Sequence, residues 1–134
     1  MKKTENNSSD FRITQRGRLG EQYVCEYLKN KDFQIIQTNY KTRYGEIDII
    51  AEKDNLIVFV EVKTRTKNSF TAGLESITKS KIKKVVKTAL IYLTENNIVK
   101  QPRLDCAEVI VEESTNALLK ILYIENAVDD WEVL

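Results

Sequence analysis

The chain has 134 residues, with 21 Lys and Arg against 20 Asp and Glu, so it carries a net charge of +1 and is long enough to bury the core of one soluble domain. It contains no histidine, which excludes a Ser-His-Asp triad, a histidine general base and histidine-ligated zinc or iron. With only Cys25 and Cys106, the chain cannot form a disulfide scaffold, and we expect a cytoplasmic protein with reduced thiols. We expect neither a membrane span nor a signal peptide.

The near-neutral net charge hides an asymmetry along the chain. Residues 1–104 hold 20 basic and 12 acidic side chains, whereas residues 105–134 hold 1 basic and 8 acidic ones. Such a split is typical of a body that binds a polyanion and ends in an acidic segment. A charge distribution without function would look the same.

The periodicity of apolar residues predicts a flexible N-terminal tail over residues 1–11 and a single domain over residues 12–134. The element order α-β-β-β-α-β-β predicts an α/β fold, a mixed sheet of about five strands flanked by helices. We expect helices over residues 16–31 and 74–96, and strands over residues 33–37, 45–52, 56–64, 104–112 and 118–124.

The two central strands are predicted to form a hairpin. Asp54 and Asn55 tolerate the left-handed backbone of a two-residue turn, which would fix the register of the strands on either side. Because side chains alternate along strands, one face is then wholly apolar and must be core. This face carries Ile47, Ile49, Ala51, Val58, Val60 and Val62.

The opposite face of this hairpin is charged. In the predicted register Glu46 lies opposite Lys63, an ordinary surface ion pair, and Asp48 lies opposite Glu61. Directly opposite residues have Cβ atoms about 4.5–5.5 Å apart, and two carboxylates in such positions destabilise a sheet unless they share a proton or a cation. Without histidine or cysteine ligands, the fitting ion is Mg²⁺ or Mn²⁺, and Lys63 on the same face could neutralise charge growing on a phosphate.

The spacing of Asp48 and Glu61-Val62-Lys63 matches the PD-(D/E)XK nuclease motif, with Ile47 where that motif often has proline. The surrounding segments resemble the bacterial YraN family, uncharacterised protein family 0102, which is similar to archaeal Holliday-junction resolvases and other restriction-endonuclease-like proteins. The segments that carry the resemblance are Arg18-Leu19-Gly20-Glu21, Tyr27-Leu28, Asn39-Tyr40-Lys41, residues 45–51, residues 58–65 and Lys81.

The resemblance implies roles for individual residues. Asp48 and Glu61 would be the metal-binding carboxylates, and the backbone carbonyl of Val62 would be a further ligand. Lys63 would orient the attacking water and stabilise the transition state. Glu21 would complete the catalytic and metal site, and it falls at the edge of the apolar helix stripe; the alternative is a first-turn acid favoured by the helix dipole.

Basic side chains near the ends of these elements would bind nucleic acid. Phosphate contacts of this kind give affinity and position rather than sequence specificity. Lys81 matches a family position and is the strongest of them, although a solvated helix face is the commoner explanation of such lysines. Tyr44 could stack on a base, but a tyrosine before a strand more often packs. The predicted contacts are Arg18, Lys41, Arg43, Arg65 and Lys81.

Together these features predict a Mg²⁺- or Mn²⁺-dependent endonuclease that acts on DNA, especially branched DNA such as Holliday junctions. The alternative is a nucleic-acid-binding or assembly protein that keeps the nuclease fold with little cleavage activity. A third, weaker alternative is a structural domain whose acids bind cations adventitiously. A homodimer is expected by resemblance, because resolvase-like proteins cut two strands.

Overall fold

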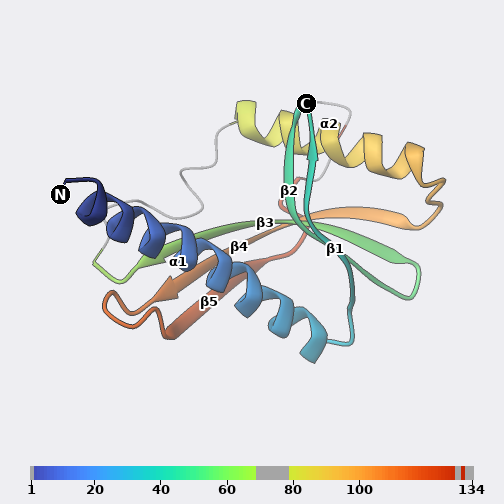
Figure 1. The fold of residues 1–134 in the computed structure, drawn as a ribbon. Coiled ribbons are helices and arrows are strands. Elements are labelled where there is room, and N and C mark those ends of the chain that lie inside the picture. The colour runs from blue at the N-terminus through green and yellow to red at the C-terminus, as the bar shows by residue number, and fades with distance from the viewer. Residues whose placement is uncertain (1, 69–78, 129–130, 132–134) are drawn as a thin grey trace.

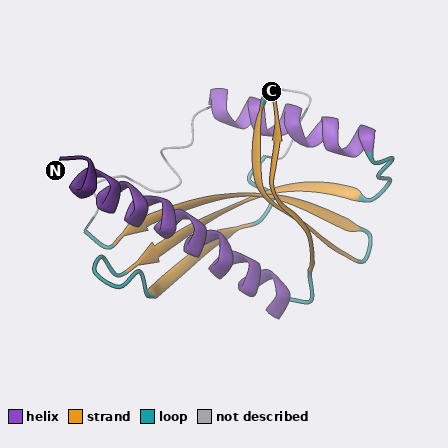
Figure 2. Ribbon diagram, viewed as in Figure 1, coloured by secondary structure: helices purple, strands orange, loops and turns teal. Residues whose placement is uncertain are grey.

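The computed structural model describes residues 2–68, 79–128 and 131. Its seven elements follow the predicted order and confirm the α/β fold (Figure 2). Within these residues, no helix combines the length and apolar character needed to cross a membrane. The elements are α1 (Lys2–Asn30), β1 (Gln34–Thr42), β2 (Gly45–Lys53), β3 (Leu56–Thr66), α2 (Lys79–Glu95), β4 (Gln101–Val111) and β5 (Leu118–Ile124).

Helix α1 differs from the prediction at its N-terminal end. It begins at Lys2, so residues 2–11 are helical where a tail was expected. Residues 2–10 contain neither glycine nor proline, so nothing in their sequence breaks a helix. Apolar periodicity did not predict these turns, because residues 2–10 contain no apolar side chain. The predicted start of the second helix, at residue 74, lies outside the described residues.

The five strands form one sheet in the order β1-β2-β3-β4-β5. Strands β3 and β4 are parallel and all other neighbours are antiparallel, so the chain must cross over between β3 and β4, and α2 lies in that connection. The two helices cover opposite faces of the sheet, each over its own apolar cluster (Figure 1). The central strands of the sheet are therefore buried on both faces, as expected for a sheet flanked by helices.

The β2–β3 hairpin has the predicted register near its turn. Lys53 lies opposite Leu56, and the ladder continues in the same register to Ile49 opposite Val60. Asp54 adopts the left-handed conformation with φ 53°, as the turn requires. Turn chemistry and alternation were sufficient to predict this part of the sheet.

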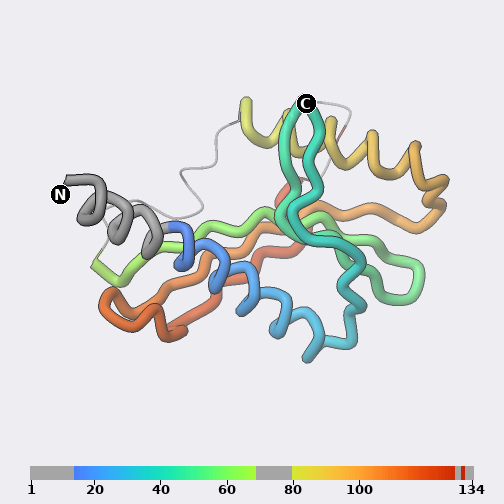
Figure 3. Tube along the Cα trace, in the orientation of Figure 1, coloured from blue at the N-terminus to red at the C-terminus, as the bar shows by residue number. Residues whose placement is uncertain are grey.

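On the N-terminal side of Ile49, away from the β2–β3 turn, strand β2 separates from β3. It stays paired with β1, and the β1–β2 hairpin bends away from the rest of the sheet toward α2 (Figure 3). Ile47 therefore packs in the α2 cluster, not beside Ile49, so the prediction that both share one face is wrong. At the end of the hairpin, a Cβ on Gly45 would lie 3.3 Å from the Thr88 hydroxyl, which shows how closely β2 meets α2. Strand twist, strongest in two-stranded ribbons, is the physical cause.

Helix α1 is held against the other face of the sheet at close range. Val24 and Leu28 are buried in the cluster that includes β3 and β4. Gly20 lies directly on β3, where an added Cβ would be 1.8 Å from the Thr64 hydroxyl oxygen. The absence of a side chain at Gly20 thus sets the separation of helix and sheet, and with it the position of Glu21.

The turn between β4 and β5 forms hydrogen bonds with α1. The Arg16 guanidinium donates to the side-chain oxygen of Asn116 at 2.8 Å and to the carbonyl of Glu113 at 3.2 Å. The Tyr23 hydroxyl donates to the carbonyl of Asn116 at 2.8 Å. These long-range bonds fix α1 along its axis and hold it in register with the sheet.

Candidate functional site

A polar cavity of about 380 Å³ lies where β2 separates from β3, beside the N-terminal part of α2. Its charged side chains are three acids and three lysines: Glu46, Asp48, Glu61, Lys63, Lys81 and Lys84. A larger cavity of about 590 Å³ lies at the β2–β3 turn and is lined by none of the predicted site residues. The chemistry predicted from the sequence therefore belongs to the smaller cavity.

Asp48 spans the gap that opens between the two strands. Its Oδ2 accepts a hydrogen bond from the backbone N–H of Val62 at 2.7 Å. Burial and, second to it, the negative charge of Glu61 together raise the pKa of the Asp48 carboxyl to about 7. The prediction that Asp48 and Glu61 are directly opposed ladder partners is wrong, because pairing ends before them. They are neighbours nonetheless, close enough to interact electrostatically.

The predicted pair of Glu46 and Lys63 is lost for the same reason. Pairing of β2 with β3 ends at Ile49, so these two residues do not face each other across a ladder. Both instead line the cavity. Glu46 thereby joins the candidate site, a position that its predicted pairing with Lys63 did not indicate.

Glu61 is buried on β3 with one satisfied and one unsatisfied oxygen. Its Oε1 lies 2.8 Å from the Lys81 ammonium. Its Oε2 is inaccessible and has no hydrogen-bond partner among the described residues. A buried carboxylate oxygen without a partner is costly, so this atom points to a missing donor or cation.

The other deeply buried aspartate shows what a satisfied carboxylate looks like in this protein. Asp105 is fully buried and accepts two hydrogen bonds from the Arg103 guanidinium, both at 2.8 Å. It also accepts from the Tyr123 hydroxyl at 2.5 Å and from the backbone N–H of Asn126 at 2.9 Å. Asp105 is a structural anchor whose oxygens are both paired, whereas Glu61 keeps one oxygen without a partner in the described part of the chain.

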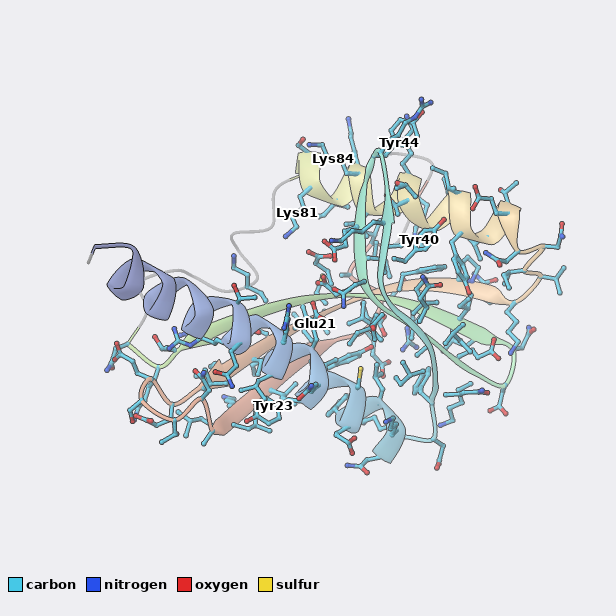
Figure 4. All side chains as sticks on the ribbon, viewed as in Figure 1. Glu21, Tyr23, Tyr40, Tyr44, Lys81 and Lys84 are labelled. Atoms are coloured by element: carbon cyan, nitrogen blue, oxygen red, sulfur yellow. The ribbon has the colours of Figure 1, made fainter. Side chains whose placement is uncertain are left out.

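Glu21 approaches this site from α1. It accepts a hydrogen bond from the Asn39 side chain at 3.2 Å. Burial raises its pKa, and the charges of Glu46 and Glu61 contribute in the same direction. Because α1 begins at Lys2, Glu21 lies far from the first turn, so the helix dipole does not explain it. In Figure 4, Glu21 extends from α1 and Lys81 from α2 into the space between the helices.

Asp48 and Glu61 are the residues that could hold a metal. Within the described part of the chain, no three acidic or thiol side chains gather closely enough to form a metal-binding group. Mg²⁺ commonly uses one or two carboxylates and completes its shell with water and phosphate. The unpartnered Glu61 oxygen beside Asp48 fits that demand, and Val62 and Lys63 line the same cavity.

The predicted phosphate contacts are distributed unevenly. Lys81 lies in the cavity, but its ammonium pairs with Glu61. Arg65 forms an ion pair with the buried Glu108 on β4, a structural role that the sequence did not indicate. Arg18 is exposed on α1 and influences the Glu21 carboxyl electrostatically, while Lys41 and Arg43 are exposed on β1 and the following turn.

A basic group at the hairpin end was only partly predicted. Lys87 places its ammonium 3.8 Å from the centre of the Tyr44 ring, and the Arg43 guanidinium carbon lies 4.8 Å from the same ring. Tyr44 thus packs on two cations rather than in the core. Lys84 lies one turn before Lys87 on the same helix and lines the cavity. The three-residue spacing of Lys81, Lys84 and Lys87 could have indicated this side of α2. We call Arg43, Tyr44, Lys84 and Lys87 the hairpin-tip cluster.

The fold and the site define an α/β domain with a carboxylate-and-lysine pocket built on the strands of a mixed sheet. Residues 20–109 match the uncharacterised protein family UPF0102, and the chain belongs to this family, as its sequence motifs predicted.

The chain is similar to UPF0102 proteins of several bacteria. A protein of Sulfurihydrogenibium sp. is 53% identical over 85 residues, covering 63% of this chain and 74% of the relative. A protein of Caldanaerobacter subterraneus subsp. tengcongensis is 41% identical over 112 residues, 83% of this chain and 92% of the relative. A protein of Alkaliphilus metalliredigens is 40% identical over 112 residues, 83% of this chain and 95% of the relative. Their names state no activity.

Proposed function

We propose that this protein is a cytoplasmic, Mg²⁺-dependent endonuclease that hydrolyses phosphodiester bonds in DNA, with branched DNA such as a four-way junction as its substrate. The observation that carries the proposal is the buried Glu61 carboxylate, which has one unpartnered oxygen and lies beside Asp48. Such a pair of carboxylates favours a hard cation, and phosphate is the substrate group that such a cation most often serves.

The charge balance of the cavity supports a phosphodiester as ligand. The three acids and three lysines that line it cancel when all are ionised. A divalent cation would leave the cavity with an excess of positive charge. A phosphodiester anion would then be attracted to a site that in the metal-free state attracts it little.

Each residue of the site then has a role. Asp48 and Glu61 would hold Mg²⁺ or Mn²⁺, with the Val62 carbonyl as a further ligand, and the ion when bound supplies stabilisation of phosphate charge. Lys63 donates a hydrogen bond to the attacking water and neutralises charge that grows on the phosphate oxygens. Glu21 adds a carboxylate on the α1 side, where it orients water at the edge of the site.

Cleavage of defined substrates tests this proposal. The full chain is incubated with labelled four-way junctions, flaps, duplexes and single strands in Mg²⁺, Mn²⁺ or EDTA. We expect cleavage in both metals, preference for the junction and no product in EDTA. Salt-sensitive binding without cleavage would instead favour a nucleic-acid-binding or assembly protein. Sedimentation of the same samples checks the predicted homodimer, which simultaneous cutting of two strands needs.

The hairpin-tip cluster is the surface that we expect DNA phosphates to contact. It gathers like charges around Tyr44, and within the described residues Arg43 and Lys87 have no ion pair with an acid. Replacing both Arg43 and Lys87 by alanine should weaken junction binding regardless of sequence. Affinity falls with salt concentration, and each lost phosphate contact should make the slope of log affinity against log salt less steep by about 0.9.

The matched control for this variant removes two exposed lysines far from the cluster. Lys29 lies near the end of α1 and Lys120 lies on β5, so Lys29→Ala with Lys120→Ala makes the same change in net charge. Fluorescence anisotropy over a salt series compares the two double variants. Equal losses of affinity would show that the effect is general charge and not this surface.

A further inference from the structure

Lys81 and Glu61 form an ion pair whose two members differ in freedom. The ammonium nitrogen lies 2.8 Å from Oε1. The Glu61 side chain is 9% exposed and comes from the middle of β3, whereas the Lys81 side chain is 47% exposed and comes from the first turn of α2. The carboxylate is therefore fixed by the sheet, and the lysine is the partner more exposed to solvent.

In this position the Lys81 ammonium supplies positive charge to the Glu61 carboxylate, as a bound metal ion would. Glu61 lies near Asp48 and Glu21, so some positive charge is needed to keep the acids together. The Lys81 ammonium supplies one charge to one oxygen and leaves Oε2 without a partner. A divalent ion on the same carboxylate would be repelled by an ammonium at hydrogen-bond distance.

We propose that Lys81 is an internal counter-ion that holds Glu61 in the metal-free protein and is released when a divalent cation binds. This inference rests on the proposed function and deepens it. Lys84 lines the same cavity one turn further along α2, so the released ammonium joins a second lysine at the cavity wall. Metal binding thereby supplies the cation at Glu61 and frees a phosphate-binding lysine in one step, which predicts that metal and phosphate bind cooperatively.

Removal of the competing ammonium should strengthen metal binding. We expect Lys81→Met to tighten Mn²⁺ binding about tenfold, because a charge-assisted hydrogen bond no longer has to be broken. Lys84→Met is the matched control, since it removes the same charge from the same cavity and no Glu61 ion pair. We expect it to tighten binding by less than about threefold, the effect of charge alone.

The experiment is a titration of the full metal-free chain with MnCl₂ in the absence of DNA, with free Mn²⁺ measured by electron paramagnetic resonance. Lys81→Arg keeps the ion pair and should bind Mn²⁺ no more tightly than the wild type. If Lys81→Met is unfolded without metal, circular dichroism should show that it recovers its fold when Mn²⁺ is added. This recovery would equally support tighter metal binding by the variant.

The outcomes separate this inference from the proposed function. Tighter binding by Lys81→Met than by Lys84→Met supports the counter-ion. Equal or weaker binding by Lys81→Met overturns it, and if Asp48→Asn still abolishes binding, the proposed metal site stands. Absence of Mn²⁺ binding in every variant overturns the metal site and the counter-ion together.

Discussion

Asp48→Asn is expected to abolish metal-dependent cleavage and, at the same time, to stabilise the metal-free protein. The substitution keeps the size of the side chain and an oxygen that can accept the Val62 N–H, but it removes the charge that a cation needs. We expect cleavage of a four-way junction to fall at least about 100-fold, the range seen when one electrostatic contact to a reacting group is lost. The rate is measured under single-turnover conditions in Mg²⁺.

The stability effect follows from the pKa of Asp48. Its folded-state pKa is raised to about 7 from an ordinary value of 3.8, so between these values the folded protein holds a proton that the unfolded chain has released. The contribution of Asp48 to the stability of the wild type therefore falls as the pH rises from about 4 to about 7 and then levels off. Asparagine does not titrate, so the variant should exceed the wild type by up to about 4 kcal/mol in unfolding free energy at pH 8 in EDTA.

Glu52→Gln is the control for both readouts. Glu52 lies on the same strand but pairs with Lys100 at 2.9 Å, away from the cavity. It should leave cleavage near the wild-type rate and should not stabilise the protein. Retained cleavage in Asp48→Asn, or a metal-free variant less stable than the wild type at pH 8, would contradict the assignment of Asp48.

Gly20→Ala is expected to destabilise the protein by about 2–3 kcal/mol, despite the better helix propensity of alanine. The new Cβ would lie 1.8 Å from the Thr64 hydroxyl oxygen and 3.0 Å from its Cβ, so α1 has to move away from β3. That shift also carries Glu21 away from the acids on the sheet. Chemical denaturation measures the change in unfolding free energy, and Mn²⁺ affinity should fall in parallel.

The same helix offers a control at Gly17. Gly17 is exposed, and an added Cβ would meet nothing within 4 Å. Gly17→Ala should therefore be neutral or stabilising by up to about 1 kcal/mol. Thr64→Ala in the Gly20→Ala background removes the closest clashing atoms and should recover part of the loss, giving a coupling energy in a double-mutant cycle. No coupling would show that Gly20 is needed for another reason.

Local chemistry made the centre of the site predictable. The turn at Asp54 determines the register of β2 and β3 beside it, and the period of two along β3 places Glu61 and Lys63 on one side. The helical projection of α1 placed Glu21 toward the sheet. Each of these inferences uses a few residues of one or two neighbouring elements, where geometry repeats regularly.

The surroundings of these residues could not be predicted in the same way. Where β2 leaves β3 depends on the twist of the hairpin and its packing on α2, which involves residues far apart in the chain. The contacts of long lysine and arginine side chains, such as Arg65 with Glu108, depend on which strand becomes the neighbour.

The amino-acid sequence by itself therefore determined the element order, because periodicity and turn chemistry act over short distances, and its motifs identified the family. It also named the carboxylates and the lysine that line the candidate site. Only the tertiary structure decided that Asp48 meets the backbone of Val62 across a gap, and that Lys81 pairs with Glu61. Both contacts arise where the sheet splits and α2 returns over it. Charge interactions depend on distance in space, which the folded chain sets and the order of residues does not.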